Sequence, residues 1–315
     1  MKQVMQTRAS SINRALDQIG DKWSLLLIGE VLWGVNTFGE LLEATGMSRG
    51  VLSDRLKWLE KVDCLKKVYA DGNTRRPVYH MTRKSVDLYD TALMSLNFER
   101  QFFSEPELDS IELHHLDCQK TFKPVLACKH CGGEVFSKDI SYHDGPGATR
   151  DLRKMKVRRK SSKSIKDVPA TNRAYTNLIH LIGDPWTANL IALSYHGIER
   201  FDDFNRELPI ATNVLTDRLK FLVEEGVFDT IPYKKRPLRV NYSLTEKGKA
   251  LFPFFQTLLQ WGDRWCSDSS GPPIVLTHTV CGEVLEAEVR CDQCDQHLIA
   301  HRVRQQSNPN ERDDN

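Results

Sequence analysis

The sequence lacks any segment that could cross a membrane. None of its apolar runs approaches the roughly 18 residues that a membrane-spanning helix needs. Its first residues, Met-Lys-Gln-Val-Met-Gln, contain no hydrophobic core of a signal peptide. We therefore expect a soluble, cytoplasmic protein without a membrane partner.

Short motifs of several common enzymes are also missing. The sequence contains no His-Glu-x-x-His metal site with an open position and no phosphate-binding glycine loop. We also expect no nucleophile elbow. We therefore expect no catalytic residue and no catalytic cofactor, and a zinc enzyme is the least favoured of the functions that we consider.

The chain has little net charge. Its 44 Lys and Arg nearly balance 42 Asp and Glu, which leaves a formal net charge of +2. A surface for nucleic acid would therefore have to come from local basic patches.

What the sequence does contain is an internal repeat. The segment Val51-Leu-Ser-Asp-Arg-Leu-Lys57 recurs as Val214-Leu-Thr-Asp-Arg-Leu-Lys220, an offset of 163 residues. The same offset places Ile19-Gly-Asp21 on Ile182-Gly-Asp184 without a gap. Because this period is far too long for a solenoid, it indicates duplication of a whole domain, and 315 residues fit two domains.

Each copy begins with the pattern of a helix-turn-helix. In the first copy, Asp21 can cap an apolar helix from about 22 to 33, and Thr37 can cap a second, shorter helix. Gly46 ends that helix and Ser48 caps the next one. A short helix, a tight turn and a longer helix in this order predict a helix-turn-helix.

The longer helix has the two faces that docking in the DNA major groove requires. Its apolar stripe consists of Leu52, Leu56 and Leu59. Its polar face consists of Arg49, Ser53 and Lys57. An ordinary amphipathic surface helix is the alternative for one copy taken alone.

Two short strands follow this helix in each copy. We expect strands at 65–69 and 78–81 around an Asp71-Gly-Asn73 turn, and at 227–231 and 240–244 in the second copy. Basic residues gather at the tips: Arg75, Arg76, Lys234, Lys235, Arg236 and Arg239. A basic hairpin in this place is typical of a wing that contacts DNA backbone or the minor groove. A solvated hairpin is the alternative.

A long helix is expected to follow each wing, at about 83–103 and 246–266. Both carry more apolar side chains than one small winged domain can cover. Such helices are natural interfaces between copies or between chains.

In these motifs the sequence resembles the HxlR family of bacterial winged-helix regulators, which are relatives of the MarR group. The matching pieces are Ile-Gly-Asp-x-Trp, Phe-x-x-Leu/Phe, Val-Leu-x-Asp-Arg-Leu-Lys and Val240-Asn-Tyr-Ser-Leu-Thr-Glu-Lys-Gly248. They occur in order and twice, over about 10–105 and 173–268. The expected fold is mainly α with small β wings (α+β): two tandem winged helix-turn-helix domains, each followed by a small Cys/His β appendage.

The resemblance implies transcription factors that dimerise through their terminal helices and bind palindromic operators in double-stranded DNA. Most members have one such domain, so the simplest expectation here is a pseudo-dimer within one chain, with a homodimer as the alternative. A small-molecule effector is a further partner to be considered.

The first copy departs from the family pattern. Cys64 stands in place of the turn glycine Gly226, and Ser85 in place of Gly248. Ser10 and Arg173 occupy the position of the family's N-terminal cysteine, which argues against a thiol switch. We interpret Cys64 as a small buried residue rather than a sensor.

Each copy ends in a His-x2-Cys-x9-Cys-x2-Cys cluster. The ligands are His115, Cys118, Cys128 and Cys131 in the first copy and His278, Cys281, Cys291 and Cys294 in the second. Four N and S ligands fill the coordination shell of a structural Zn²⁺. We expect a short hairpin to bring the ligands of each cluster together, hence two structural zinc ions. The alternative is a metal-free appendage whose cysteines are buried or oxidised.

These patterns divide the chain into domains. We expect winged-helix domains at 10–105 and 173–268, appendages at 111–143 and 274–304, a basic flexible linker at 144–170 and a disordered tail at 305–315. The linker's basic run could lie along phosphates and add affinity without sequence choice, or it could be a solvated connector.

The leading hypothesis is a sequence-specific transcriptional regulator. Its predicted DNA contacts are Ser48, Arg49, Ser53, Arg55, Lys57, Arg75, Arg76, Thr212, Asn213, Thr216, Arg218, Lys220, Lys234, Lys235, Arg236 and Arg239. Asn213 is the best base reader, because its amide can pair with adenine through two hydrogen bonds. Arg55 and Arg218 would grip phosphates or buttress the helix. In the alternative hypothesis the first domain has lost DNA binding and serves dimerisation or effector sensing.

Overall fold

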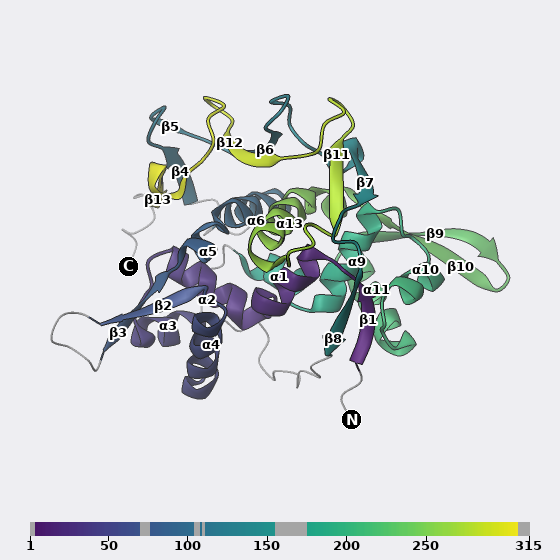
Figure 1. The fold of residues 1–315 in the computed structure, drawn as a ribbon, viewed down its shortest axis with the longest axis horizontal. Coiled ribbons are helices and arrows are strands. Elements are labelled where there is room, and N and C mark those ends of the chain that lie inside the picture. The colour runs from purple at the N-terminus through teal and green to yellow at the C-terminus, as the bar shows by residue number, and fades with distance from the viewer. Residues whose placement is uncertain (1–3, 70–75, 104–107, 109–110, 155–174, 308–315) are drawn as a thin grey trace. The chain divides into compact units, whose positions relative to one another are not determined.

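The structure is a computed structural model that describes residues 4–69, 76–103, 108, 111–154 and 175–307 (Figure 1). It is mostly helical with small antiparallel sheets, which confirms the expected fold class. Within those ranges no helix has the length and apolar character needed to span a membrane.

The chain divides into two compact units, and neither is simply one copy of the repeat. Unit 1 contains the described residues of 1–22, 136–165 and 180–285. Unit 2 contains those of 23–135, 166–179 and 286–315. Each unit therefore takes its winged-helix core from one copy and some flanking segments from the other.

The helix-turn-helix of unit 2 consists of α2 (Lys22–Leu32), α3 (Phe38–Thr45) and α4 (Arg49–Lys61). Its boundaries follow the predicted caps. Thr37 forms a capping box with Glu40, Gly46 ends α3 at a φ of 60°, and the Ser48 hydroxyl accepts a hydrogen bond from the first turn of α4. The leucine stripe of α4 is fully buried, as expected.

Unit 1 repeats this arrangement with α9 (Pro185–Tyr195), α10 (Phe201–Glu207) and α11 (Thr212–Glu224). Asp184 caps α9 by accepting a hydrogen bond from Trp186 N at 2.8 Å. Leu215, Leu219 and Leu222 of α11 are completely buried. Burial of such a side chain contributes about 1.5–3 kcal/mol, so the stripe holds the helix against its unit while the opposite face stays exposed.

Both wings are present, and the second is longer than predicted. In unit 2, β2 (Leu65–Tyr69) pairs with β3 (Pro77–Met81). In unit 1, β9 (Phe228–Lys235) pairs with β10 (Leu238–Leu244), with Lys235 opposite Leu238. The basic residues at this end are therefore mostly strand residues rather than a loop, since cross-strand pairing continues almost to the turn. The predicted turn at 71–73 lies outside the described residues.

In the turn after each recognition helix, the residue that matches Gly226 is Asp63 and not, as the sequence analysis stated, Cys64. Asp63, with a φ of 57°, occupies the left-handed position that Gly226 occupies with a φ of 69° in the second copy. Cys64 instead corresponds to Val227, and both are completely buried. The expected replacement of Gly226 by Cys64 was therefore wrong by one residue, whereas the interpretation of Cys64 as a small buried residue is confirmed.

The long terminal helix of each copy is broken into two, which the sequence analysis did not predict. Unit 2 has α5 (Arg83–Val86) and α6 (Tyr89–Phe102). Unit 1 has α12 (Glu246–Ala250) and α13 (Phe252–Cys266). Pro253 explains the second break, because proline has no N–H and fits only the first turn of a helix.

The apolar face of α13 is covered by a helix from the other copy. This helix, α1 (Ser11–Ile19), approaches so closely that a Cβ on Gly262 would lie 2.3 Å from Ser11 O. The Ser11 hydroxyl donates a hydrogen bond to Asp263, and Arg14 pairs with Asp268 at 3.2 Å. The expected interface between copies is thus confirmed inside unit 1.

Unit 2 holds the corresponding segment of the second copy by different contacts. Glu99 of α6 accepts hydrogen bonds from Leu178 N at 2.7 Å and from Asn177 Nδ2 at 3.1 Å, at the start of α8 (Thr176–Ile182). Tyr175 stacks on Trp33 with ring centroids 6.3 Å apart. In unit 2 the Glu99 carboxylate thus holds α8 by accepting a hydrogen bond from an N–H group near the start of that helix, whereas in unit 1 α1 is held by its close approach to α13.

The buried carboxylate of Asp263 makes the stability of unit 1 depend on pH. Burial raises the pKa of Asp263 to about 6 from 3.8, although the Ser11 hydrogen bond and Arg14 oppose the shift. The protonated carboxyl thus stabilises unit 1 fully below pH 3.8, and this contribution is lost as the pH rises through 6. The loss is at most about 3 kcal/mol.

We expect Asp263→Asn to stabilise the protein above pH 6 and to flatten this part of its pH dependence, because the amide keeps an acceptor for Ser11 without a charge. Urea unfolding between pH 4 and 8 measures it. An unchanged pH dependence in the variant would contradict the assignment.

The two Cys/His appendages do not fold separately, contrary to expectation. In unit 2, β4 (Ile111–His115) pairs with β5 (Lys120–Thr121) and with β13 (Val303–Ser307), and β6 (Pro124–Cys128) pairs with β12 (Ala287–Cys291). In unit 1, β7 (Ile140–Asp144) pairs with β11 (Ile274–His278). Every one of these sheets joins strands of both copies.

Two predicted boundaries also change, because strands extend beyond them. The expected linker begins as a strand, because β8 (Arg150–Lys154) pairs with β1 (Val4–Arg8). The expected disordered tail begins too early, because residues 305–307 belong to β13. The remainder of the linker from residue 155, and the tail from residue 308, lie outside the described residues.

Candidate nucleic-acid interface and metal centre

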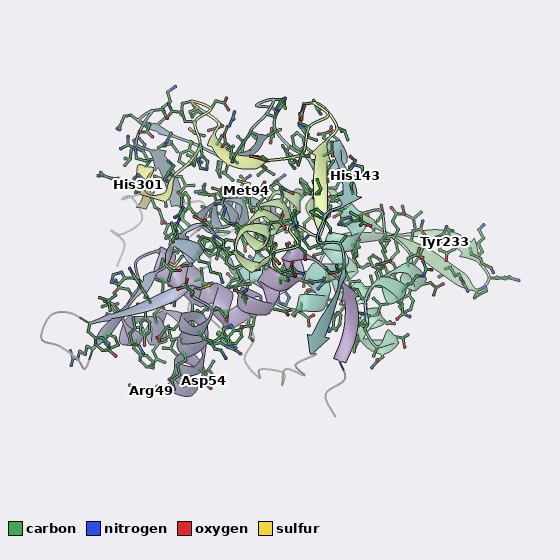
Figure 2. All side chains as sticks on the ribbon, in the orientation of Figure 1. Arg49, Asp54, Met94, His143, Tyr233 and His301 are labelled. Carbon is green, nitrogen blue, oxygen red and sulfur yellow. The ribbon has the colours of Figure 1, made fainter. Side chains whose placement is uncertain are left out.

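The recognition helix α4 presents a polar face opposite its buried leucines. Arg49 and Lys57 are exposed and Ser53 is half-buried, as is Arg55. Figure 2 shows Arg49 and Asp54 on this helix; Asp54 is also exposed, so the face carries a negative charge among its basic groups.

Ser48 lies at the start of α4 and is exposed. Gly46-Met-Ser48-Arg-Gly50 has the spacing of a nucleophile elbow, a match that the sequence analysis overlooked. The serine lies between two helices, however, and its hydroxyl caps α4. An elbow requires a strand before the serine, so this match indicates a cap rather than catalysis.

The second recognition helix, α11, exposes its predicted base-facing residues. Thr212, Asn213, Thr216 and Lys220 are all exposed. The Thr216 hydroxyl donates to Thr212 O at 2.9 Å, and Lys220 Nζ lies 3.6 Å from a Glu224 carboxylate oxygen. Asn213 makes neither of these contacts and lies in the first turn, which enters the groove first in this motif.

Arg218 flanks the buried leucine stripe of α11 and holds the helix to its neighbour α9. Its Nε and Nη2 donate to the same oxygen of Asp184 at 3.0 and 2.7 Å. Asp184 also caps α9, so one carboxylate fixes the start of α9 and the middle of α11. Of the two roles expected for Arg218, the structure gives contacts for buttressing.

The wings present their basic residues to solvent. Arg76 is exposed in unit 2, while Arg75 lies outside the described residues. In unit 1 all four predicted residues are exposed: Lys234, Lys235, Arg236 and Arg239. Arg239 lies 3.5 Å from Asp202, and Tyr233, labelled on this hairpin in Figure 2, stacks under Arg200 at 4.9 Å. The least constrained cations are thus at the end of the hairpin.

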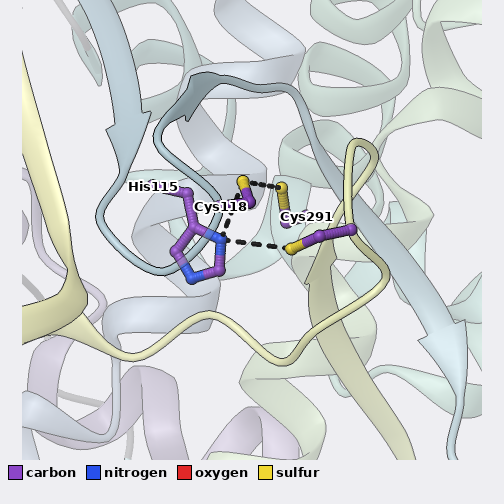
Figure 3. Close-up of side chains that lie close together, drawn as sticks. His115, Cys118 and Cys291 are labelled. Carbon is purple, nitrogen blue, oxygen red and sulfur yellow. Dashed lines mark hydrogen bonds between the residues drawn. The ribbon is translucent and has the colours of Figure 1, made fainter.

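Four predicted metal ligands lie together in unit 2, and they come from both copies. His115, Cys118, Cys291 and Cys294 have ligand atoms within 4.8 Å of one another. Cys118 Sγ is 3.5 Å from His115 Nδ1 and 3.9 Å from Cys291 Sγ, and Cys294 Sγ is 3.3 Å from His115 Nδ1 (Figure 3).

These separations fit a tetrahedral zinc ion. With Zn–S of about 2.3 Å and Zn–N of about 2.05 Å, tetrahedral angles place two sulfurs about 3.8 Å apart and a nitrogen and a sulfur about 3.6 Å apart. The three observed distances lie within 0.3 Å of those values. His115 and Cys291 are completely buried, which also suits a closed structural site.

Two similar turns supply the ligands. His115 ends β4, and a turn closed by Gln119 N to His115 O at 2.8 Å brings Cys118 back beside it. Cys291 ends β12, and a turn closed by Asp295 N to Cys291 O at 2.9 Å returns Cys294. Gln119 and Asp295 both have a φ of 57°, the left-handed conformation that lets each turn close.

Further contacts orient the ligands. His115 Nε2 faces Asp117 Oδ2 at 3.3 Å, although the angle does not make an ordinary hydrogen bond. Asp117 in turn pairs with Arg302, which holds the pKa of that carboxyl below its usual range. A carboxylate behind a ligand histidine is typical of zinc sites, and the sequence analysis missed it.

The expectation that each cluster forms its own site is wrong for this tetrad. A strand such as β6 advances about 3.3 Å per residue, so it carries Cys128 away from Pro124 along β12 instead of returning it to Cys118. Cys128 and Cys131 lie in unit 2, outside the tetrad. His278 and Cys281 lie in unit 1, with Cys281 Sγ 3.4 Å from His278 Nδ1. Zinc binding by Cys128, Cys131, His278 and Cys281 stays a prediction.

Comparison with known proteins places the domain in a family. The model of the HxlR-like helix-turn-helix matches residues 18–105 and 181–270, together more than half of the chain. A similar relative is the HTH-type transcriptional regulator Rv3095 of Mycobacterium tuberculosis, 37% identical over 42% of this chain and 83% of its own length. The regulator YodB of Bacillus subtilis is 32% identical over 33% of this chain and 86% of its own.

A solved structure is similar to one part of the chain. The crystal structure of PA1607, a candidate transcription factor, has 30% sequence identity and a TM-score of 0.39, and covers 43% of this chain and 94% of its own. The two matches of the family model coincide with the two helix-turn-helix regions described above. The chain therefore belongs to the HxlR-like helix-turn-helix family of transcriptional regulators, and it carries the family's domain twice.

Proposed function

We propose that both winged-helix domains bind DNA, as a pseudo-dimer within one chain, on a palindromic operator. The observation that carries this proposal is that α4 and α11 each expose a polar and basic face opposite a fully buried leucine stripe. Two recognition helices of the same design match two half-sites, as in dimeric relatives of the helix-turn-helix class.

The α1–α13 contact supports the pseudo-dimer. A helix of the first copy covers the terminal helix of the second, which is the kind of exchange that a dimer of single-domain chains would make between its subunits. A second chain is then not needed to cover α13. The footprint described below tests for a homodimer of this chain.

In this proposal the residues have distinct roles. Asn213 reads a base edge, and Thr212, Thr216 and Lys220 lie beside it; Ser48, Arg49, Ser53 and Lys57 are the corresponding set on α4. Arg218 positions its helix through Asp184, and Arg55 grips phosphates or buttresses α4. The wing cations, Arg75, Arg76, Lys234, Lys235, Arg236 and Arg239, contact the backbone or minor groove.

Two alanine substitutions separate base reading from phosphate binding. We expect Asn213→Ala to relax the preference at one base pair per site, because a bidentate amide contact gives about 1–3 kcal/mol of discrimination. Arg236→Ala should instead weaken all sequences alike and lower the salt dependence by about one ion. Titration of operator variants at several salt concentrations measures both, and the reverse pattern would contradict the assignment.

A footprint on the DNA upstream of the chain's own gene tests the pseudo-dimer at physiological salt. Two protected half-sites about 10 base pairs apart per bound chain are expected. Four half-sites would show that the chain dimerises or that one domain does not bind. Protection without any half-site symmetry would contradict the palindromic arrangement.

We also propose that the His115, Cys118, Cys291 and Cys294 tetrad holds a structural zinc ion. Bound zinc would supply four strong bonds and no open position for a substrate. Because the ligands come from two turns that are far apart in the sequence, the ion would hold the ends of β4 and β12 together. The eight predicted ligands of the chain allow two such ions.

A further inference from the structure

Unit 1 contains a cavity of about 140 Å³ that the winged-helix function does not use. It lies between α1, α9 and α13, with β7 and β11 at one side. Most of its wall is apolar, including Phe252, Phe255 and Leu259. A cavity of roughly this size, if apolar, accommodates a molecule such as benzene.

Gln256 and Tyr142 each place in this wall a polar atom that has no hydrogen-bond partner among the residues that the structure describes. Gln256 is 3% exposed, and its Oε1 accepts no hydrogen bond, although its Nε2 donates to Gln260 at 3.2 Å. The Tyr142 hydroxyl is likewise buried without a partner. Burial raises the pKa of Tyr142, so this hydroxyl keeps its proton and remains a donor. A buried polar atom without a partner is costly and calls for an explanation.

The internal repeat shows that the fold does not need an amide at two positions of this wall. The residue that matches Gln256 in the first copy is Leu93, and the residue that matches Asn189, which also lines the cavity, is Leu26. Leu26 and Leu93 are 2% and 4% exposed, so leucine packs well at both positions. The second copy therefore has amides at two positions where the first copy has core leucines, although an apolar residue at each position would leave no polar group unsatisfied.

We propose that this cavity is a binding site for a small, uncharged, single-ring aromatic molecule with a hydroxyl group, that is, a phenol. The aromatic wall receives the ring, Gln256 Oε1 accepts a hydrogen bond from the ligand hydroxyl, and the Tyr142 hydroxyl can donate to its oxygen. A volume of about 140 Å³ fits a single ring, and the described residues of the lining include no Lys or Arg whose charge would favour a carboxylate ligand.

The position of the site gives it a means of regulation. Ile12 of α1 lines the same cavity as Gln256 of α13, so a ligand contacts both helices of the exchanged pair. A bound ligand would thereby favour the arrangement in which α1 packs on α13. The size of this effect is set by the difference between the ligand's affinities for the packed and unpacked arrangements. The binding site is proposed independently of DNA binding, and its test contains no DNA.

The test uses the full chain and phenol as the probe, with binding followed by ligand-detected NMR and titration calorimetry. Phenol should bind once per chain, and toluene, which has nearly the same shape but no hydroxyl, at least about tenfold more weakly. Gln256→Leu, which copies Leu93, should lower phenol affinity at least about tenfold without lowering the melting temperature. Gln101→Leu, at an exposed position of α6, is the matched control and should leave phenol binding unchanged.

Tyr142→Phe removes only the hydroxyl and provides a second variant should Gln256→Leu fold poorly; it should also weaken phenol but not toluene. The proposal is overturned if phenol does not bind, if toluene binds as tightly, or if both variants retain wild-type affinity. Since no DNA is present, such a failure would leave the proposed operator binding unaffected.

Discussion

Replacing Cys291 by serine is expected to remove one zinc ion per chain and to unfold the sheets of unit 2 that hold the tetrad. Cys291 is completely buried at the end of β12 and lies 3.9 Å from the Cys118 sulfur. Structural zinc sites have apparent binding free energies of about 10–16 kcal/mol, as large as the whole stability of many domains. Few other single changes in this chain should cost as much.

The metal content and the melting curve measure this effect. Cys118→Ser should lose the same ion, although Cys291 and Cys294 belong to the other copy, because all of these ligands share one site. Cys266→Ser changes a cysteine outside both clusters and should leave the metal content unchanged. Full zinc occupancy in both ligand variants would contradict the shared tetrad.

Arg49→Glu is expected to lower operator affinity at least about a hundredfold. The residue is exposed at the start of α4, where recognition helices meet base edges. Loss of one bidentate contact costs about 1–3 kcal/mol. The new carboxylate also repels the DNA phosphates and adds to the negative charge of the exposed Asp54 on the same helix. Lys220→Glu on α11 should have an effect of similar size, since the two helices have equivalent roles in a pseudo-dimer.

Fluorescence anisotropy with operator DNA measures both variants at one salt concentration. Arg83→Glu makes the same charge reversal at an exposed position of α5, and it measures the loss of DNA affinity that comes from the change in net charge alone. If Arg49→Glu behaves like this control while Lys220→Glu does not, the first domain does not read DNA, and the alternative of a dimerisation or effector module replaces the pseudo-dimer.

Caps and buried stripes were predictable because they depend on neighbouring residues. Thr37, Gly46 and Ser48 set the boundaries of α3 and α4 through hydrogen bonds and dihedral angles that span at most one turn. The leucines of α4 follow the helical period, so their burial needed no knowledge of distant contacts. The break before α13 was also present in the sequence as Pro253 and could have been predicted.

The sequence by itself thus determined the repeated winged-helix domain, the exposed faces of both recognition helices and the eight residues with metal-ligand chemistry. Tertiary structure alone decided which copy supplies each partner: α1 lies on α13, and Cys291 joins His115. The physical reason is degeneracy. Because the two copies have the same strands and ligand spacing, local energies favour pairing within a copy and across copies about equally, and only the packing of the whole chain separates them.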